Sequence, residues 1–130
     1  MTNPVQIALI GVLILLFKHL VFDFLLQAAY QYRNKGIYGH PGGILHAGLH
    51  AFGTTPVFLW IAPSMQLALA IMIGEFIVHY HIDWTKEQIV KRMKWTADNA
   101  PFWWTLGVDQ FLHGATYVAI VALLMAGRGG

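Results

Sequence analysis

The chain has 130 residues, of which 57% are hydrophobic and only 11% are charged. Soluble domains carry about 25% charged residues, so too few charges remain here to cover a surface in water. The same balance excludes an intrinsically disordered chain. The absence of cysteine excludes disulfide frameworks and thiolate metal sites. The length suits one domain, residues 1–130. The composition therefore predicts an all-α integral membrane protein.

Four segments have the roughly 20 mostly apolar residues that a membrane-spanning helix needs. Asn3 is suited to cap a first helix that begins at Pro4. Pro56 should kink the second helix or end it early. The segment 85–97 has the pattern of a short helix at the membrane surface, with a simple extension of the third span as the alternative. The expected spans are residues 4–32, 43–62, 63–84 and 101–126, which predicts a four-helix membrane bundle.

The basic residues predict the orientation in the membrane. Six of the eight lysines and arginines lie after the first and third expected spans, and a four-span chain places these two loops on one side. The positive-inside rule assigns that side to the cytoplasm, so both termini face outward. The expected location is a bacterial inner membrane, with membrane lipids as partners. We attribute the net charge of +2 to these basic loops on one side of the membrane and not to nucleic-acid binding. The six residues are Arg33, Lys35, Lys86, Lys91, Arg92 and Lys94.

Ionisable side chains recur at four-residue spacing in every expected span. Residues four apart lie on one helical face, and an ionisable group inside a bilayer is costly enough to need a partner or a function. Counting about 1.5 Å per residue from the outer ends places the four rows at a similar depth, in the cytoplasmic half of the bilayer. The rows are His19 and Asp23; His46 and His50; Glu75, His79 and Asp83; and Asp109 and His113.

Imidazole and carboxylate groups are the ligands of zinc, iron or manganese in sites without cysteine. Helical bundles build such sites from side chains that face a common core. We therefore expect one or two divalent metal ions, zinc first, with iron or manganese as alternatives. A metal-free network between the helices, able to conduct protons, is the competing interpretation. The expected ligands are His19, Asp23, His46, His50, His79, Asp83, Asp109 and His113, whereas His40 and His81 are expected to lie outside the site.

Other polar residues near the rows are candidates for catalysis or substrate binding. Glu75 lies one turn from the histidine layer, where it could act as a general base. Lys86 could bind an anionic headgroup, although the simpler interpretation is that its positive charge only helps to orient the protein in the membrane. Gln27 and Gln110 could hydrogen-bond a ligand or substrate, or only join two helices. Lys18, near mid-span, is expected to pair with a carboxylate across a helix contact or to snorkel.

The combined motifs resemble a known but uncharacterised family. The sequence reads HxxxDFxLQ from His19 to Gln27, then HxxxH from His46, ExxxHxxxD from Glu75, and DQxxH from Asp109. This order and spacing, from about Leu15 to Tyr117, resemble a domain-of-unknown-function family of small bacterial polytopic membrane proteins that is also met in phage genomes. The resemblance implies no activity. The chain is more loosely similar to membrane-bound proteins classed as metal-dependent hydrolases, which also place His and Asp on membrane helices.

Three classes of function stay open at this point. The first is an intramembrane metal-dependent hydrolase that acts on a lipid or lipid-linked substrate, because a bound metal ion activates water. The second is a di-metal redox enzyme, which visible absorption would separate from a colourless zinc protein. The third is an accessory or assembly subunit of a larger membrane complex, or a proton or metal-ion conduit. A homo-oligomer is compatible with each of them.

Overall fold

The computed structural model describes residues 3–128, and the regular structure in this range is entirely helical. The all-α fold class is therefore confirmed. Four stretches are long and apolar enough to cross a membrane: Pro4–Leu25, Pro41–Ile61, Met65–Met93 and Ala100–Gly127. The elements are α1 (Pro4–Leu20), the π-helical turn η1 (Val21–Leu25), α2 (Ala29–Tyr32), α3 (Pro41–Phe52), α4 (Thr55–Ile61), α5 (Met65–Met93) and α6 (Ala100–Gly127).

The first helix begins as predicted but ends earlier. Asn3 caps it through a reciprocal capping box. The helix predicted to reach residue 32 changes to a π-helix at η1, where the backbone N–H of Leu26 donates to the carbonyl of Val21. The chain then bends and forms the single turn α2. A π-helical turn is wider than an α-helical one and is often found at a functional site; here it carries Asp23.

The second apolar segment is divided, as Pro56 predicts. The helix α3 ends at Phe52, and Gly53 and Thr54 separate it from α4. A glycine is required at this break because α1 approaches closely. A Cβ atom at Gly53 would clash with the ring of Phe22 and lie 2.9 Å from the Cγ of Lys18. The break therefore lets the end of α1 pack against α3 and α4.

The third helix is longer than predicted. The helix α5 runs without interruption from Met65 to Met93, so the separate surface helix predicted for 85–97 is wrong and the alternative, a continuous extension, is correct. Ser64 caps this helix by accepting a hydrogen bond from the backbone N–H of Leu67. The extension forms because the sequence from Glu75 to Met93 contains neither glycine nor proline.

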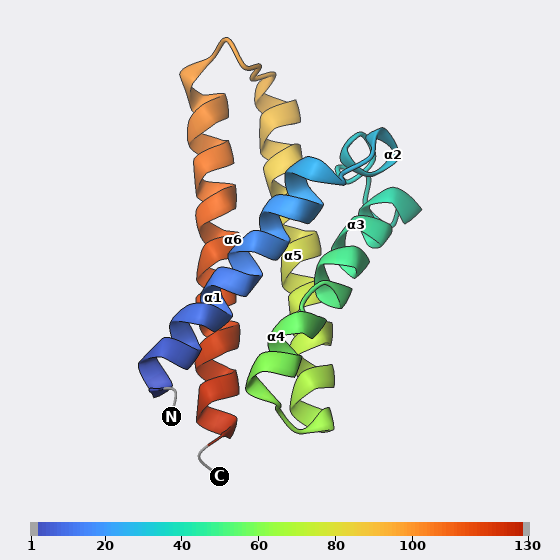
Figure 1. The fold of residues 1–130 in the computed structure, drawn as a ribbon. Coiled ribbons are helices and arrows are strands. Elements are labelled where there is room, and N and C mark those ends of the chain that lie inside the picture. The colour runs from blue at the N-terminus through green and yellow to red at the C-terminus, as the bar shows by residue number, and fades with distance from the viewer. Residues whose placement is uncertain (1–2, 129–130) are drawn as a thin grey trace.

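The long helices pack side by side and separate an apolar half from a polar half. The helix α3 packs against α5, α5 against α6, and α1 crosses α6 (Figure 1). The beginning of α1 and the end of α6 lie near the α4–α5 turn, whereas α2 and the α5–α6 connection lie at the opposite end of the molecule (Figure 1). Around Leu15, Val57, Tyr117 and Leu124, a hydrophobic core fills the half nearest the termini. The other half encloses polar side chains.

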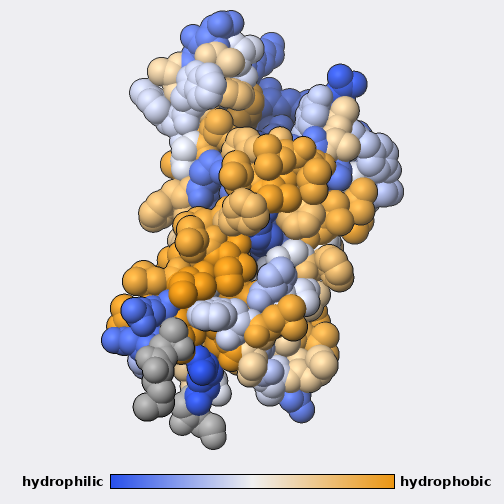
Figure 2. All heavy atoms as spheres, in the orientation of Figure 1, coloured by the Kyte–Doolittle hydropathy of each residue, from blue (hydrophilic) through white to orange (hydrophobic). Residues whose placement is uncertain are grey.

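The outer surface of the long helices is strongly apolar. Figure 2 shows hydrophobic residues gathered over the middle of one face, with hydrophilic residues towards both ends. Large side chains such as Leu13, Phe17, Ile73 and Phe111 are exposed on these helices. An apolar surface of this extent is suited to contact with another apolar phase rather than with water.

Candidate metal centre

The structure brings the eight predicted ligands together in the half of the molecule nearest α2. Seven of them are buried, and Asp23 is half-buried. Each of the four long helical segments contributes, so the rows predicted from four-residue spacing do face a common centre. The contributors are His19 from α1, Asp23 from η1, His46 and His50 from α3, His79 and Asp83 from α5, and Asp109 and His113 from α6.

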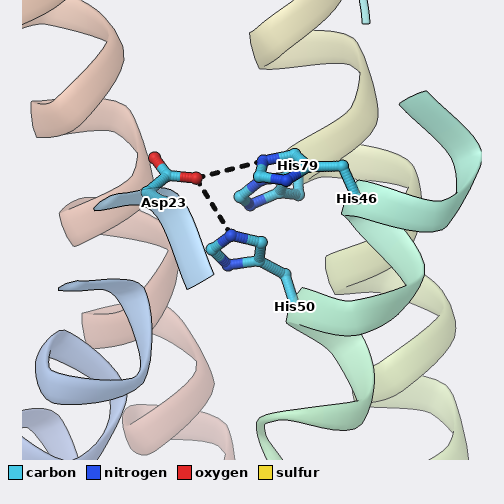
Figure 3. Close-up of side chains that lie close together, drawn as sticks. All are labelled: Asp23, His46, His50 and His79. Atoms are coloured by element: carbon cyan, nitrogen blue, oxygen red, sulfur yellow. Dashed lines mark hydrogen bonds and ion pairs between the residues drawn. The ribbon is translucent and has the colours of Figure 1, made fainter. Parts of the chain in front are cut away.

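One group that could hold a metal ion consists of Asp23, His46, His50 and His79 (Figure 3). One ligand atom from each residue lies within 4.8 Å of the others. The Oδ1 atom of Asp23 lies 3.0 Å from the Nε2 atoms of both His46 and His50. The Nε2 atoms of His46 and His79 are 3.3 Å apart. Three imidazoles and one carboxylate match the number and type of ligands that zinc takes.

A second group of this kind consists of His79, Asp83 and His113, so the two groups share His79. Asp83 Oδ1 lies 3.2 Å from His113 Nε2, and Asp83 Oδ2 lies 3.4 Å from His79 Nε2. Asp109 Oδ1 is 3.6 Å from His113 Nε2 and is buried without a hydrogen-bond partner. The shared histidine makes the arrangement suitable for one ion or for two neighbouring ions.

Gln31 determines which nitrogen of His46 carries a proton. The Oε1 atom of Gln31 lies 3.2 Å from His46 Nδ1. A carbonyl oxygen can only accept, so Nδ1 is the donor and a neutral His46 presents a lone pair at Nε2. That lone pair faces oxygens of Asp23 and Asp83 at 3.0 and 3.1 Å. Acceptors face one another here, which is repulsive unless a metal ion or an additional proton lies between them.

His19 has a different environment from the other histidines. Its Nε2 atom lies 3.1 Å from Asp23 Oδ2 and 2.8 Å from Gln110 Oε1, so this nitrogen donates. Its Nδ1 atom accepts from the Tyr117 hydroxyl at 2.8 Å. Both ring nitrogens thus have protein partners. This geometry favours a role in orienting Asp23, as is common around metal ligands; direct ligation by His19 stays a prediction.

Glu75 is engaged by other side chains instead of facing the histidine cluster. It forms a buried ion pair with Lys18 and accepts a hydrogen bond from Thr54. Lys18 Nζ also donates to the backbone carbonyl of His50 at 3.1 Å and lies 4.4 Å from the centre of the Tyr117 ring. The predicted pairing of Lys18 with a carboxylate is confirmed. Both oxygens of Glu75 have partners, so its role as a general base stays a prediction.

A polar cavity of about 360 Å³ lies beside the cluster. Lys35, which was not among the predicted site residues, lines this cavity and is buried with its Nζ atom 3.3 Å from Asp83 Oδ2. Burial opposes the charged form of Lys35, but nearby carboxylates, Asp83 foremost, raise its pKa above the ordinary value. Asp23 and Asp109 line the same cavity, as do the three residues predicted to bind substrate, Gln27, Lys86 and Gln110.

Three contributors to the site were missed from the sequence. Tyr117 follows His113 by four residues, so it continues a row that could have been extended by one step. Gln31 and Lys35 likewise continue the four-residue spacing of His19, Asp23 and Gln27, but they follow the bend after η1, so they do not lie on the same helix as that row. They reach the site only because the first helix ends early.

Comparison with known proteins identifies the family but no activity. The family described as protein of unknown function (DUF3307) matches residues 12–128, a range that includes the whole polar cluster and the lining of the cavity. No curated protein and no solved structure matches the chain. The chain therefore belongs to the DUF3307 family of proteins of unknown function.

Proposed function

We propose that the protein is a membrane-embedded metalloprotein that binds one or two divalent ions, zinc first, and hydrolyses a lipid or lipid-linked substrate at the cytoplasmic side of a bacterial inner membrane. Four long apolar helices and an apolar outer surface support the membrane part of this proposal. The concentration of basic residues near α2 and the end of α5 supports the orientation with that end in the cytoplasm.

The proposal of a metal site is supported by one observation: several hydrogen-bond acceptors point at one another around His46. Its proton is held at Nδ1 by Gln31, while Nε2 faces two carboxylates and another imidazole. A divalent ion at this point would turn these repulsive contacts into ligand bonds. Asp23 and Asp83 together would balance its two positive charges. The fixed tautomer is the arrangement that ligating histidines generally show.

Hydrolysis is the chemistry that best suits such an ion next to a polar cavity. A bound metal ion lowers the pKa of a coordinated water and polarises the oxygen of a scissile phosphoryl or acyl group. The free oxygen of Asp109, buried beside His113, would be available to accept a proton from a water on such an ion. Glu75 is the alternative general base for this step.

The test is elemental analysis of detergent-purified protein that has met no chelator. We expect the wild type to retain about one or two zinc ions per chain, and His50→Ala and His113→Ala to lose most of this metal, because each removes a ligand. His81→Ala is the matched control. His81 is an exposed histidine of α5 that contacts the backbone carbonyl of Ile77 and the hydroxyl of Tyr38, outside both groups.

Several outcomes would contradict this proposal. Metal-free wild-type protein, or equal metal content in all four proteins, would refute the metal centre and favour the protonated network. Visible absorption with bound iron would favour a redox enzyme. Persistent co-purification with one larger complex would favour an accessory role.

The general base can be identified in protein that holds the metal. Asp109→Asn should retain at least part of the metal but abolish the release of phosphate or fatty acid from phospholipid vesicles. If only Glu75→Gln abolishes this release, the base is Glu75.

A further inference from the structure

A second, apolar cavity of about 440 Å³ lies between α5 and α6 on the outside of the molecule. On α5 its lining extends from Ile77 to Ile89, and on α6 it includes Val108 and Leu112. Twelve residues of helix correspond to about 18 Å, close to the ~15 Å of one leaflet of the hydrocarbon core. The groove therefore has the length and polarity that suit one lipid chain.

This groove adjoins the polar cavity beside the candidate metal centre. Lys86 and Asp109 line both cavities. Asp109 is 3% exposed, and its Oδ1 atom has no hydrogen-bond partner in the described structure. A buried, unpaired carboxylate oxygen is costly, and its retention at the junction of the two cavities indicates that something polar meets it there.

The comparable groove between α1 and α4 lacks this connection. It is also apolar, with a volume of about 520 Å³, and is lined by residues such as Phe17 and Leu59. None of its lining residues lines the polar cavity. The two grooves therefore differ in their access to the site, which makes the second one an internal reference for non-specific lipid contact.

The charges of the polar cavity depend on the metal. Its lining carries three carboxylates, Asp23, Glu87 and Asp109, and two ammonium groups, Lys35 and Lys86. Asp83, paired with Lys35 at 3.3 Å, adds a fourth carboxylate next to the cavity. Without metal the site thus has two net negative charges and would repel an anion, whereas one divalent ion would neutralise it and a second would make it positive. Binding of an anionic group in the cavity therefore requires the metal.

We infer that the protein takes one phosphate-bearing lipid from the cytoplasmic leaflet, with a chain in the α5–α6 groove and its anionic headgroup in the metal-loaded polar cavity. The headgroup part rests on the proposed function, because it needs the metal ion. The chain part rests on the groove alone. In this pose the bond between headgroup and lipid lies at the junction, beside Asp109. Lys86 lines both cavities at the same point, with its Nζ atom 2.7 Å from Glu87 Oε1.

The experiment uses nanodiscs that contain phosphatidate with a photoreactive acyl chain, and parallel nanodiscs with diacylglycerol carrying the same chains. We expect metal-loaded wild type to be labelled by phosphatidate several-fold more on the α5–α6 groove than on the α1–α4 groove. We expect diacylglycerol to label both grooves alike. Val108→Trp, which fills the first groove, should remove the enrichment, whereas Leu59→Trp in the second groove should leave it unchanged.

Metal content is measured on the same samples, which separates the two proposals. Loss of the enrichment when the metal is chelated supports the inference. Equal phosphatidate labelling of both grooves, or the same enrichment on the α5–α6 groove with diacylglycerol as with phosphatidate, overturns the inference even if zinc is bound. Enrichment in protein that holds no metal refutes the proposed function and the metal dependence, but leaves the α5–α6 lipid groove standing.

Discussion

At the scale of single residues, the site depends on a glutamine that binds no metal. Gln31 holds the proton of His46 on Nδ1 and so directs the Nε2 lone pair towards Asp23, Asp83 and His79. Without this partner the ring could carry its proton on Nε2 and donate to a carboxylate. One hydrogen bond thereby decides whether His46 is a ligand or a donor.

We therefore expect Gln31→Leu to weaken metal binding by about 10- to 100-fold without removing any ligand, as is typical when the partner of a ligating histidine is lost. Affinity is measured by competition with a chromophoric chelator. Gln66→Leu, at an exposed position of α5, is the control and should bind as the wild type does. If Gln31→Leu binds the metal as tightly as the wild type, then the hydrogen bond from His46 to Gln31 does not control metal binding by His46.

The ligand candidates could be predicted from the sequence, whereas some of their partners could not. Ionisable groups such as Asp83 and His113 are conspicuous in an apolar helix because each is costly there, and four-residue spacing fixes the face on which they lie. Gln31 and Lys35 continue the four-residue spacing of His19, Asp23 and Gln27, but they lie where the sequence becomes polar and such residues are ordinary. Their approach to the site depends on the bend after η1, which the spacing does not reveal.

At the scale of elements, the two interruptions in the apolar segments shape the site. The π-helical turn η1 carries Asp23 and precedes the bend that returns α2 towards α3. The break at Gly53 lets the ring of Phe22 and the side chain of Lys18 approach α3. Pro56 predicted the second interruption. The first could not be predicted, because Val21–Leu25 contains neither proline nor glycine.

Gly53→Ala should destabilise the protein by about 1–3 kcal/mol, since the added methyl group overpacks the contact with Phe22 and Lys18. Gly48→Ala is the matched control in the neighbouring helix α3. A Cβ atom there meets no other atom within 4 Å, and alanine should stabilise the helix by about 0.5–1 kcal/mol. Thermal unfolding in detergent measures both. Equal effects of the two substitutions would contradict the close approach of α1.

At the scale of the whole molecule, the described structure has two unlike ends. The helix ends nearest the termini lie together with the α4–α5 turn, and the α5–α6 connection lies at the other end with α2 (Figure 1). The basic residues after the first long helical segment and those in and just after the last part of α5 belong to this second end. Composition and charge alone predicted this arrangement, because an even number of crossings returns the chain to the side on which it began.

The orientation can be measured directly, because the chain contains no cysteine of its own. Single cysteines at Asp98→Cys, in the α5–α6 connection, and at Arg128→Cys, after α6, lie at exposed positions of opposite ends. In intact cells, a membrane-impermeant maleimide should label the second variant and spare the first, whereas permeabilised cells should show labelling of both. The reverse pattern would place the basic end outside and contradict the orientation.

The ion pair between Lys18 and Glu75 also bears on how the chain is assembled. A lysine in the centre of a spanning helix raises the cost of inserting that helix by about 2.5–3.5 kcal/mol. Its partner is synthesised 57 residues later, on the third long helix. We therefore expect the first helix to stay in or beside the translocation machinery until Glu75 emerges, so that at least three of the long helices enter the bilayer together.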